Sequence, residues 1–313
     1  MSAPAVPAAV PRVARPSVRG RGDRWGSIVE VWFRAHTALV YVFLYAPIFV
    51  VVLFAFNDTR GVAARFEGFS TRWFEIALND PVVIKALANS FIIAIPNAIL
   101  ASLFGTMAAL GLQRVGKRVR LAFDGLTYMS VIVPEIVIAL ATLVLFATGF
   151  DIIEALTGVK PRFGHVTIIA AHVLFNTSLV LLLVRARLSG MDRTLVEASA
   201  DLFATPWRTF RQITFPQLLP AIVAGFLLSF TFSFDDYVIT TFVSGPGSTT
   251  LPLFIFGEVR KGVTPETNAV ATMILGFTLA MLFVGQAILT WQSRRAGRRG
   301  GGMAAVVTEA SDR

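Results

Sequence analysis

Three carboxylates lie inside long apolar stretches of this chain. Asp235 and Asp236 are adjacent in "SFTFSFDDYVITTF", residues 229–242, and Glu135 lies in "VIVPEIV", residues 131–137. A charged side chain at mid-membrane costs about 2.5–3.5 kcal/mol, and such residues mostly line a water-filled cavity or pair with an opposite charge. We therefore take all three as candidate functional residues. The alternative is that they bond a helix junction and never meet a transported solute.

The two aspartates cannot share one direction if they lie on a continuous helix, because adjacent residues there point about 100° apart. One of them is then expected to line a pathway while the other bonds to a neighbouring helix. No lysine or arginine lies in either apolar stretch to neutralise the acids. Pro134 is expected to kink the helix beside Glu135 and to free a carbonyl group.

Composition places these residues in a membrane protein. Of 313 residues, 55% are hydrophobic and 15% charged, and the mean hydropathy is +0.69, too apolar for an ordinary soluble domain. A spanning helix needs about 20 apolar residues. The sequence predicts an all-α protein with six spans, at roughly 39–56, 90–112, 126–150, 166–184, 218–243 and 269–291. The absence of cysteine excludes disulfides, thiolate metal sites and cysteine nucleophiles.

The distribution of basic residues predicts the orientation. If both termini are cytoplasmic, 20 lysines and arginines lie on that side and 8 on the other, as the positive-inside rule favours. The net charge of +9 then reflects flanks attracted to anionic lipid, without any need for nucleic acid. We predict a disordered cytosolic tail over residues 1–35, a membrane domain over 36–293 and a cytosolic tail over 294–313.

Several enzymatic sites are not supported. "GLQRVGKR", residues 111–118, fits a phosphate-binding loop until its last position, where Arg118 replaces the required serine or threonine. His165 and His172 are seven residues apart and could share a helix face, but no carboxylate is in phase with them, so we expect packing or rim residues and no metal site. We find no credible catalytic triad and expect no catalytic residues in this chain.

The polar segment between the fourth and fifth spans is long enough to have its own structure. Thr194 and Glu197 have the spacing of a capping box, and Thr205 before Pro206 predicts the start of a second helix. Pro216 is expected to break the helix before the fifth span. The result is a cytosolic helix-turn-helix over about residues 187–216, either resting on lipid or docking a cytosolic partner.

"EASADLFA…ITFPQLLP" in this segment resembles the EAA loop in permease subunits of bacterial ABC importers. Glu197, Ala198 and Ser199 stand for E-A-A, and Ile213 to Pro216 stand for I-x-L-P. Phe203 stands where that family has glycine, and a left-handed conformation costs a non-glycine residue about 1–2 kcal/mol. The turn is therefore expected to differ in shape or to be capped one residue later. The resemblance implies that this loop couples to the ATPase subunit. Its coupling residues are Glu197, Ala198, Ser199, Asp201, Phe203, Ile213 and Pro216.

The stretch from Ser233 to Ile274, with "SFDDYVI", "SGPGSTTLP" and "GVTPETNAVAT", resembles the polyamine branch of these permeases, above all the putrescine-type second permease. The resemblance implies a MetI-like fold and an importer in the bacterial inner membrane. Its expected partners are a homologous permease, two copies of an ATP-binding subunit and a periplasmic polyamine-binding protein. It implies no cofactor in this chain, because the ATPase subunits bind ATP and magnesium.

A polyamine gives the acids an expected role. Ammonium groups on an apolar stem suit carboxylates with aromatic walls, so the candidate pathway comprises Asp235, Asp236, Glu135, Tyr237 and Phe232. One alternative is an importer permease for another small cationic or amino-acid-like solute. Another is an ion-coupled secondary transporter, which would also place carboxylates in its helices but would not need the structured loop.

Overall fold

A computed structural model describes the backbone of residues 23–59, 61, 65–192 and 194–311, and side chains from residue 29 to 287 and at 290 within those ranges. The chain divides into two compact units, residues 1–50 and 51–313, and each is described by itself. The described residues are helical apart from turns, loops and one isolated bridge between Asn57 and Phe69.

The first unit contains most of α1 (Asp23–Ala55), whose apolar side chains from Val29 to Val50 are exposed, as suits a helix surrounded by lipid. The helix begins at Asp23, so the expectation of disorder over residues 1–35 is wrong from there onward, and residues 1–22 lie outside the described part. Side-chain pairs four residues apart stabilise the helix before residue 36: Glu30 with Arg34, and Trp32 stacked on His36.

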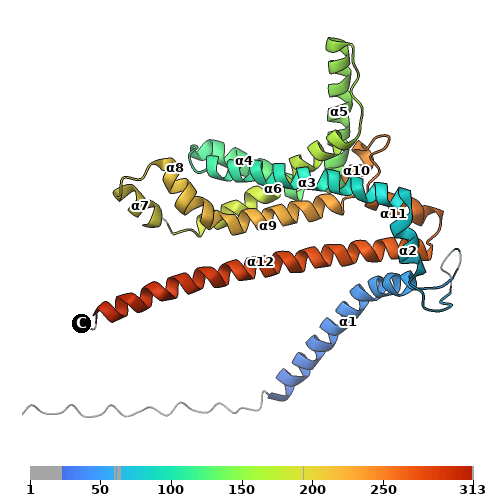
Figure 1. The fold of residues 1–313 in the computed structure, drawn as a ribbon, viewed down its shortest axis with the longest axis horizontal. Helices are drawn as coiled ribbons and strands as arrows, with labels where there is room; N and C mark the ends of the chain where they lie inside the picture. The colour runs from blue at the N-terminus through green and yellow to red at the C-terminus, as the bar shows by residue number, and fades with distance from the viewer. Residues whose placement is uncertain (1–22, 60, 62–64, 193, 312–313) are drawn as a thin grey trace, which may run out of the picture. The chain divides into compact units, whose positions relative to one another are not determined.

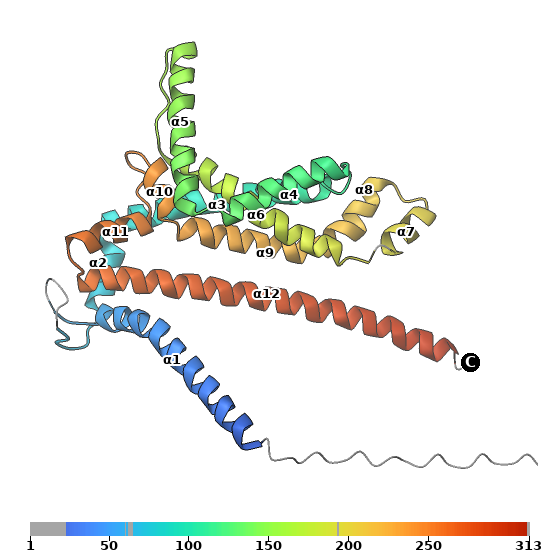
Figure 2. The same cartoon turned by 180° about the vertical axis from the view of Figure 1, so that it is seen from behind.

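The second unit is a set of membrane-crossing helices linked by shorter ones (Figures 1 and 2). In chain order it comprises α2 (Arg72–Asn79), α3 (Pro81–Gly111), α4 (Lys117–Ile132), α5 (Glu135–Thr157), α6 (His165–Ser189), α7 (Thr194–Asp201), α8 (Pro206–Thr209), a π-helical turn (Phe210–Thr214), α9 (Phe215–Phe234), α10 (Val238–Val243), α11 (Leu251–Lys261) and α12 (Pro265–Ser311).

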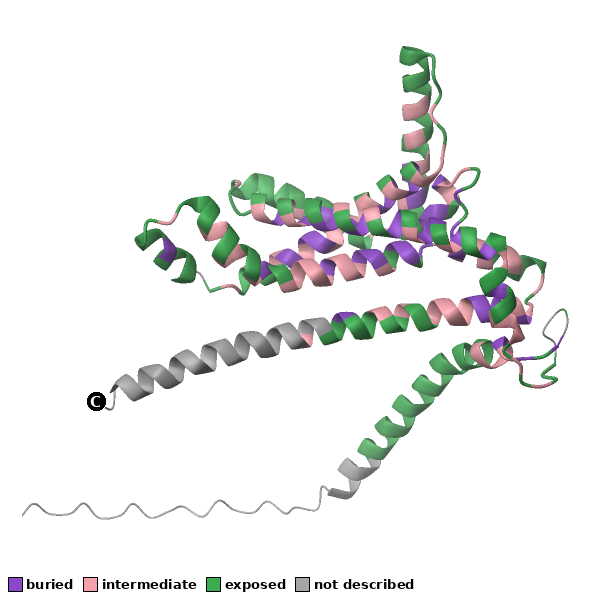
Figure 3. Ribbon diagram, viewed as in Figure 1, coloured by how far each residue is buried: buried purple, intermediate pink, exposed green. Residues whose placement is uncertain are grey.

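The core of this unit lies where α3, α6 and α9 run side by side, and buried residues concentrate there (Figure 3). Val180 of α6 lies between two glycines. A Cβ atom on Gly105 would be 2.7 Å from the Val180 Cβ, and one on Gly225 would be 3.1 Å from its Cγ1. Close approach over small residues is how membrane helices gain packing energy without a hydrophobic driving force.

Six helical segments are long and apolar enough to cross a membrane, as expected: Val29–Ala55, Pro81–Gly111, Glu135–Thr157, His165–Ser189, Pro206–Phe234 and Pro265–Ala287. The first two spans begin earlier than expected, at Val29 and Pro81, and two further expected spans are broken. The third is interrupted at Val133–Pro134, because Pro134 lacks the N–H that a helix interior needs, and α5 begins at Glu135. The fifth ends at Phe234, before the aspartates. The expected C-terminal tail continues α12 as helix to Ser311.

The connection after α10 is tied to the helices around it. Asn89 of α3 donates to the carbonyls of Gly247 and Thr249 at 3.0 and 2.9 Å, and Thr167 of α6 donates to the Val243 carbonyl at 2.7 Å. Gly245 lies so close to Phe163 that a Cβ atom there would be 1.8 Å from the Phe163 carbonyl oxygen. These contacts tie the C-terminal end of α10 and the segment after it to α3 and α6.

Candidate functional site

The aspartate pair lies at a break between two helices. α9 ends at Phe234, Asp235 and Asp236 follow, and α10 starts at Val238. The Asp236 carboxylate caps α10: it accepts from the backbone N–H of Thr240 at 2.7 Å and of Ile239 at 3.3 Å. A helix N-terminus offers unpaired N–H groups and a positive dipole end, which offsets the cost of a carboxylate at this depth.

A histidine completes the surroundings of Asp236. The Nε2 atom of His172, in α6, lies 3.1 Å from Asp236 Oδ2, and its Nδ1 atom lies 2.7 Å from the Ser233 hydroxyl. The Thr240 hydroxyl donates to the same aspartate oxygen at 2.7 Å. His172 and Asp236 are both buried. Sequence reasoning missed this contact, since it sought a carboxylate in phase with His172 on its own helix and the partner lies on another.

Asp235 has a different environment from its neighbour. It is exposed in this chain, and its carboxyl interacts with the Thr278 side chain of α12. No lysine, arginine or histidine among the described residues forms an ion pair with it. The break in the helix, which the sequence did not predict, is what separates the two aspartates into one buried and one accessible carboxylate.

Glu135 approaches the same place from another helix. It is the first residue of α5, which packs against α10, and its carboxyl interacts with that of Asp236. Glu135 is exposed and, like Asp235, has no ion-pair partner among the described residues. The structure therefore brings all three predicted acids together, each at the end of a helix.

The two predicted aromatic residues are already in contact with other rings. Tyr237 stacks on Phe256 of α11, with ring centroids 3.8 Å apart, and Phe232 meets Phe175 of α6 edge to face at 6.2 Å. Phe232 remains 47% exposed. Its ring is therefore accessible on one face, whereas the Tyr237 ring is covered by its partner on one side.

On the opposite side of the core, the loop between α6 and α9 starts with a cap that differs from the predicted one. The Thr194 hydroxyl and backbone N–H both donate to Asp192 Oδ1, at 2.8 and 2.9 Å. Asp192 thus caps α7, and the capping box expected between Thr194 and Glu197 is wrong, because the carboxylate is the stronger acceptor. These hydrogen bonds lower the pKa of Asp192. Glu197, Ala198 and Asp201 lie exposed on α7.

Phe203 ends α7 in the conformation that favours glycine. Its φ is +54°, in the left-handed region. The Phe203 N–H donates to the Ala200 carbonyl at 2.9 Å, and the Ala204 N–H to the Ser199 carbonyl at 3.0 Å, the two bonds of a Schellman motif. The turn is therefore not displaced by one residue, contrary to that expectation. The ring itself is 95% exposed.

The second half of the loop joins α9 directly. Thr205 caps α8, accepting from the Arg208 N–H at 3.4 Å as predicted, and the Ser199 and Thr209 hydroxyls lie 2.9 Å apart, linking α7 to α8. Pro216 does not break the helix as expected. In the π-helical turn that precedes it, the Phe215 N–H donates to the Phe210 carbonyl. The chain therefore stays helical although Pro216 has no N–H to donate. Ile213 is half-buried in that turn.

Known proteins match this chain over most of its length. A family model described as "Binding-protein-dependent transport system inner membrane component" matches residues 101–298. The putrescine transport system permease protein PotI of Escherichia coli (strain K12) is 42% identical over 239 residues, 76% of this chain and 83% of that protein. The spermidine/putrescine transport system permease protein PotC of the same strain is 34% identical over 249 residues, 80% of this chain and 90% of that protein.

Solved structures agree on the fold. A chain of a bacterial ABC transporter involved in the import of the acidic polysaccharide alginate superposes with a TM-score of 0.69 and 13% identity, covering 86% of this chain and 98% of that one. The helical core, the six apolar helices and the structured loop between α6 and α9 thus define an ABC importer permease fold. The chain belongs to the family of binding-protein-dependent transport system inner membrane components.

Proposed function

We propose that this chain is the membrane-spanning subunit of an ATP-driven importer that carries polyamines, putrescine or spermidine, into the cytoplasm. The names of its relatives support the substrate class. The observation that carries the proposal is the pair of accessible carboxylates, Asp235 and Glu135, which have no cationic partner among the described residues. A polyamine supplies ammonium groups for both.

The three acids then have different roles along the pathway. Asp235 and Glu135 contact the passing cation directly, because both are accessible. Asp236 is engaged by His172, Thr240 and the α10 N-terminus, so it holds the junction on which the other two depend. The exposed face of Phe232 supplies an aromatic wall beside them, and the Tyr237 ring, backed by Phe256, supplies a second.

Charge-removing variants test this proposal. Asp235→Asn and Glu135→Gln keep size while deleting the charge that pairs with the ammonium group. A hydrogen bond to a charged group contributes about 1.5–3 kcal/mol, so uptake of radiolabelled putrescine at low concentration is expected to fall about 10- to 100-fold. Glu75→Gln removes a carboxylate from the exposed surface of α2 and is the matched control. Normal uptake by both pathway variants, with the complex intact in a pull-down, would refute the substrate role.

We also propose that α7 and the turn after it dock the ATP-binding subunits, two copies of which would bind ATP and magnesium, and that this chain holds no cofactor. Exposed residues on α7 (Glu197 and Ala198) and the exposed Phe203 ring support the docking role. Glu197→Lys is expected to uncouple ATP hydrolysis from uptake while leaving membrane insertion unchanged. Wild-type ATPase stimulation and wild-type uptake in the purified Glu197→Lys complex would contradict it.

The remaining partners and the orientation are also proposals. A homologous second permease and a periplasmic polyamine-binding protein would complete the importer, and one similar structure contains a binding protein loaded with alginate. The excess of basic residues on the side of the termini supports a cytoplasmic location for both of them. Reporter fusions after Gly297 and after Glu75 should therefore report opposite compartments, and the same compartment for both would overturn the orientation.

A further inference from the structure

The carboxyls of Glu135 and Asp236 form a pair whose charge no lysine or arginine balances. Glu135 begins α5, which packs against α10, and its carboxyl interacts with that of Asp236, the residue that caps α10. Neither acid forms an ion pair with a lysine or arginine among the described residues. Two carboxyls in contact cannot both ionise without a large cost, so one of them is expected to hold a proton.

The hydrogen bonds around Asp236 indicate which acid is ionised. Its Oδ2 atom is buried among donors: it accepts from the Thr240 N–H and hydroxyl, both at 2.7 Å, and lies 3.1 Å from His172 Nε2. Its Oδ1 atom has one long bond, from the Ile239 N–H at 3.3 Å. Several donors stabilise an ionised carboxylate, and Glu135 has none of this kind among the described residues. The proton therefore belongs on Glu135, whose O–H can donate to the incompletely bonded Asp236.

His172 does not supply the missing positive charge. Its Nδ1 atom lies 2.7 Å from the hydroxyl of Ser233, which is buried and has no other hydrogen-bond partner among the described residues. A buried hydroxyl proton needs an acceptor, so Ser233 is assigned as the donor to Nδ1. The ring is then neutral, with its proton on Nε2 toward Asp236. The other titratable groups at the junction are Glu135 and the flanking Asp235 and Tyr237, none of them cationic, and α10 contains no titratable residue.

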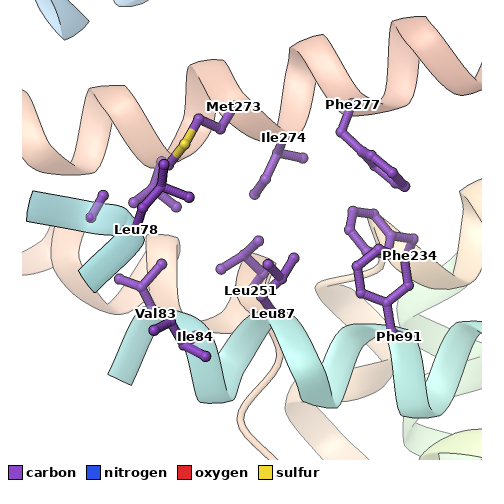
Figure 4. Close-up of a pocket in the computed structure, with 12 residues that line it drawn as sticks. Leu78, Val83, Ile84, Leu87, Phe91, Phe234, Leu251, Met273, Ile274 and Phe277 are labelled. Atoms are coloured by element: carbon purple, nitrogen blue, oxygen red, sulfur yellow. The ribbon is translucent and has the colours of Figure 1, made fainter. Parts of the chain in front are cut away.

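The apolar cavity next to this junction offers a cation no alternative place. It lies between α2, α3, α11 and α12, with Phe234 in its wall, and has a volume of about 170 Å³ (Figure 4). All twelve residues that line it are apolar. An ammonium group there would lose its water without gaining an acceptor, which is costly. A cation that reaches the junction therefore binds at the exposed acids, Asp235 and Glu135.

We propose that Glu135 and Asp236 share one proton before the substrate arrives, and that an ammonium group of the substrate displaces it. The proposal rests on the polyamine function and adds that cation binding at Glu135 releases a proton. The Glu135 O–H bond breaks and the proton passes to water on the exposed side of that residue. The ammonium group keeps its own protons, since alkylammonium ions stay charged near neutral pH, and its charge then balances the newly ionised carboxylate. Protons therefore compete with the substrate for this site.

The pH dependence of uptake tests this exchange. The complete importer, with its own binding protein, is reconstituted in proteoliposomes with equal pH on both sides. Uptake of radiolabelled putrescine at low concentration is then measured from about pH 5 to about pH 8. Release of one proton makes uptake rise by up to about tenfold per pH unit wherever Glu135 is protonated before the substrate binds. Dividing the uptake of each variant by that of the parent at the same pH cancels the pH responses of the binding protein and the ATPase.

Three variants separate the shared proton from other titrations. Glu135→Gln removes the group that holds the proton, and Asp236→Asn removes the second acid, so that Glu135 stays ionised. For both variants the ratio of uptake to that of the parent should fall about tenfold or more as the pH rises through this range. Asp235→Asn is the matched control, because it deletes a neighbouring charge and leaves the pair intact. Its ratio to the parent should be low and the same at every pH.

The proposal requires the ratio to fall in both variants of the pair. A ratio that is constant and below one in Glu135→Gln, with a fall in Asp236→Asn alone, would assign the titration to His172 and overturn the proposal. A fall in Glu135→Gln alone would show that Glu135 titrates without Asp236, and constant low ratios in both variants would show that no proton is exchanged; either result would overturn it too. Failure of the substrate proposal looks different: the parent takes up no putrescine, or Asp235→Asn and Glu135→Gln match the parent at every pH.

Discussion

Two helix junctions in this chain use different means to turn the backbone. The junction between α9 and α10 depends on side chains: Asp236 caps α10 and is itself bonded by His172 and Thr240. The junction after α7 depends on the backbone, with two main-chain hydrogen bonds around a left-handed Phe203. The first lies among buried residues and the second is exposed to water. Substitution of a side chain should therefore disrupt the first junction and scarcely affect the second, except at Phe203.

The largest effect is expected from Asp236→Ala. It leaves His172, the Thr240 hydroxyl and two backbone N–H groups without their acceptor in a buried site. Removing one member of a buried, bonded pair costs about 3–5 kcal/mol, so the detergent-purified complex should melt at a lower temperature and assemble in lower yield. Asp236→Asn keeps one acceptor oxygen and should lose less. Equal melting temperatures for Asp236→Ala and the parent would show that the junction does not depend on this side chain.

A smaller effect, opposite in sign, is expected at Phe203. Phe203→Gly relieves a left-handed conformation that costs a non-glycine residue about 1–2 kcal/mol, part of which is offset by the greater freedom of glycine when unfolded. The loop should become more protected in hydrogen exchange. Phe203→Ala removes the ring but keeps the strain, so it is the matched control. If the ring docks the ATPase, both variants lower ATPase stimulation while only the glycine variant increases protection. Equal protection in both would disprove the strain.

The smallest effect is expected at Asp192, which caps α7 in water as Asp236 caps α10 among buried residues. Asn is almost as good a cap as Asp, so Asp192→Asn should leave uptake unchanged. The lowered pKa of Asp192 sets the sign of a pH dependence. Its contribution to α7 is present above the unfolded pKa of about 3.9 and is lost as the pH falls through the lower folded value. Hydrogen exchange of α7 at pH 7 and below pH 3 measures this loss, which Asp192→Asn should abolish.

The sequence predicted the number of spans better than it predicted local geometry. Long apolar runs are a strong signal because a membrane demands them. The break at Asp235 was not predicted, since no proline or glycine lies between Phe226 and Val243 and the bonds to His172 and Thr240 that favour a break come from the fold. The same holds for Asp192, whose advantage over Thr194 as a cap depends on the fold of the preceding turn. At Phe203 the residue type predicted an altered or displaced turn, but the backbone keeps the left-handed conformation at the position where the resembling family has glycine.

The C-terminus of α9 directs its last backbone carbonyls toward the same region as the Asp235 carboxylate. Aligned peptide dipoles place roughly half a negative elementary charge at such an end. This charge belongs to the main chain, so no side-chain substitution removes it and no change of pH neutralises it. The positive N-terminus of α10 at the same break is capped by Asp236, so a cation at Asp235 meets the permanent negative end of α9 together with the titratable carboxylate. The main chain thus contributes a fixed part of the attraction for a cation, and the ionised carboxylates add to it.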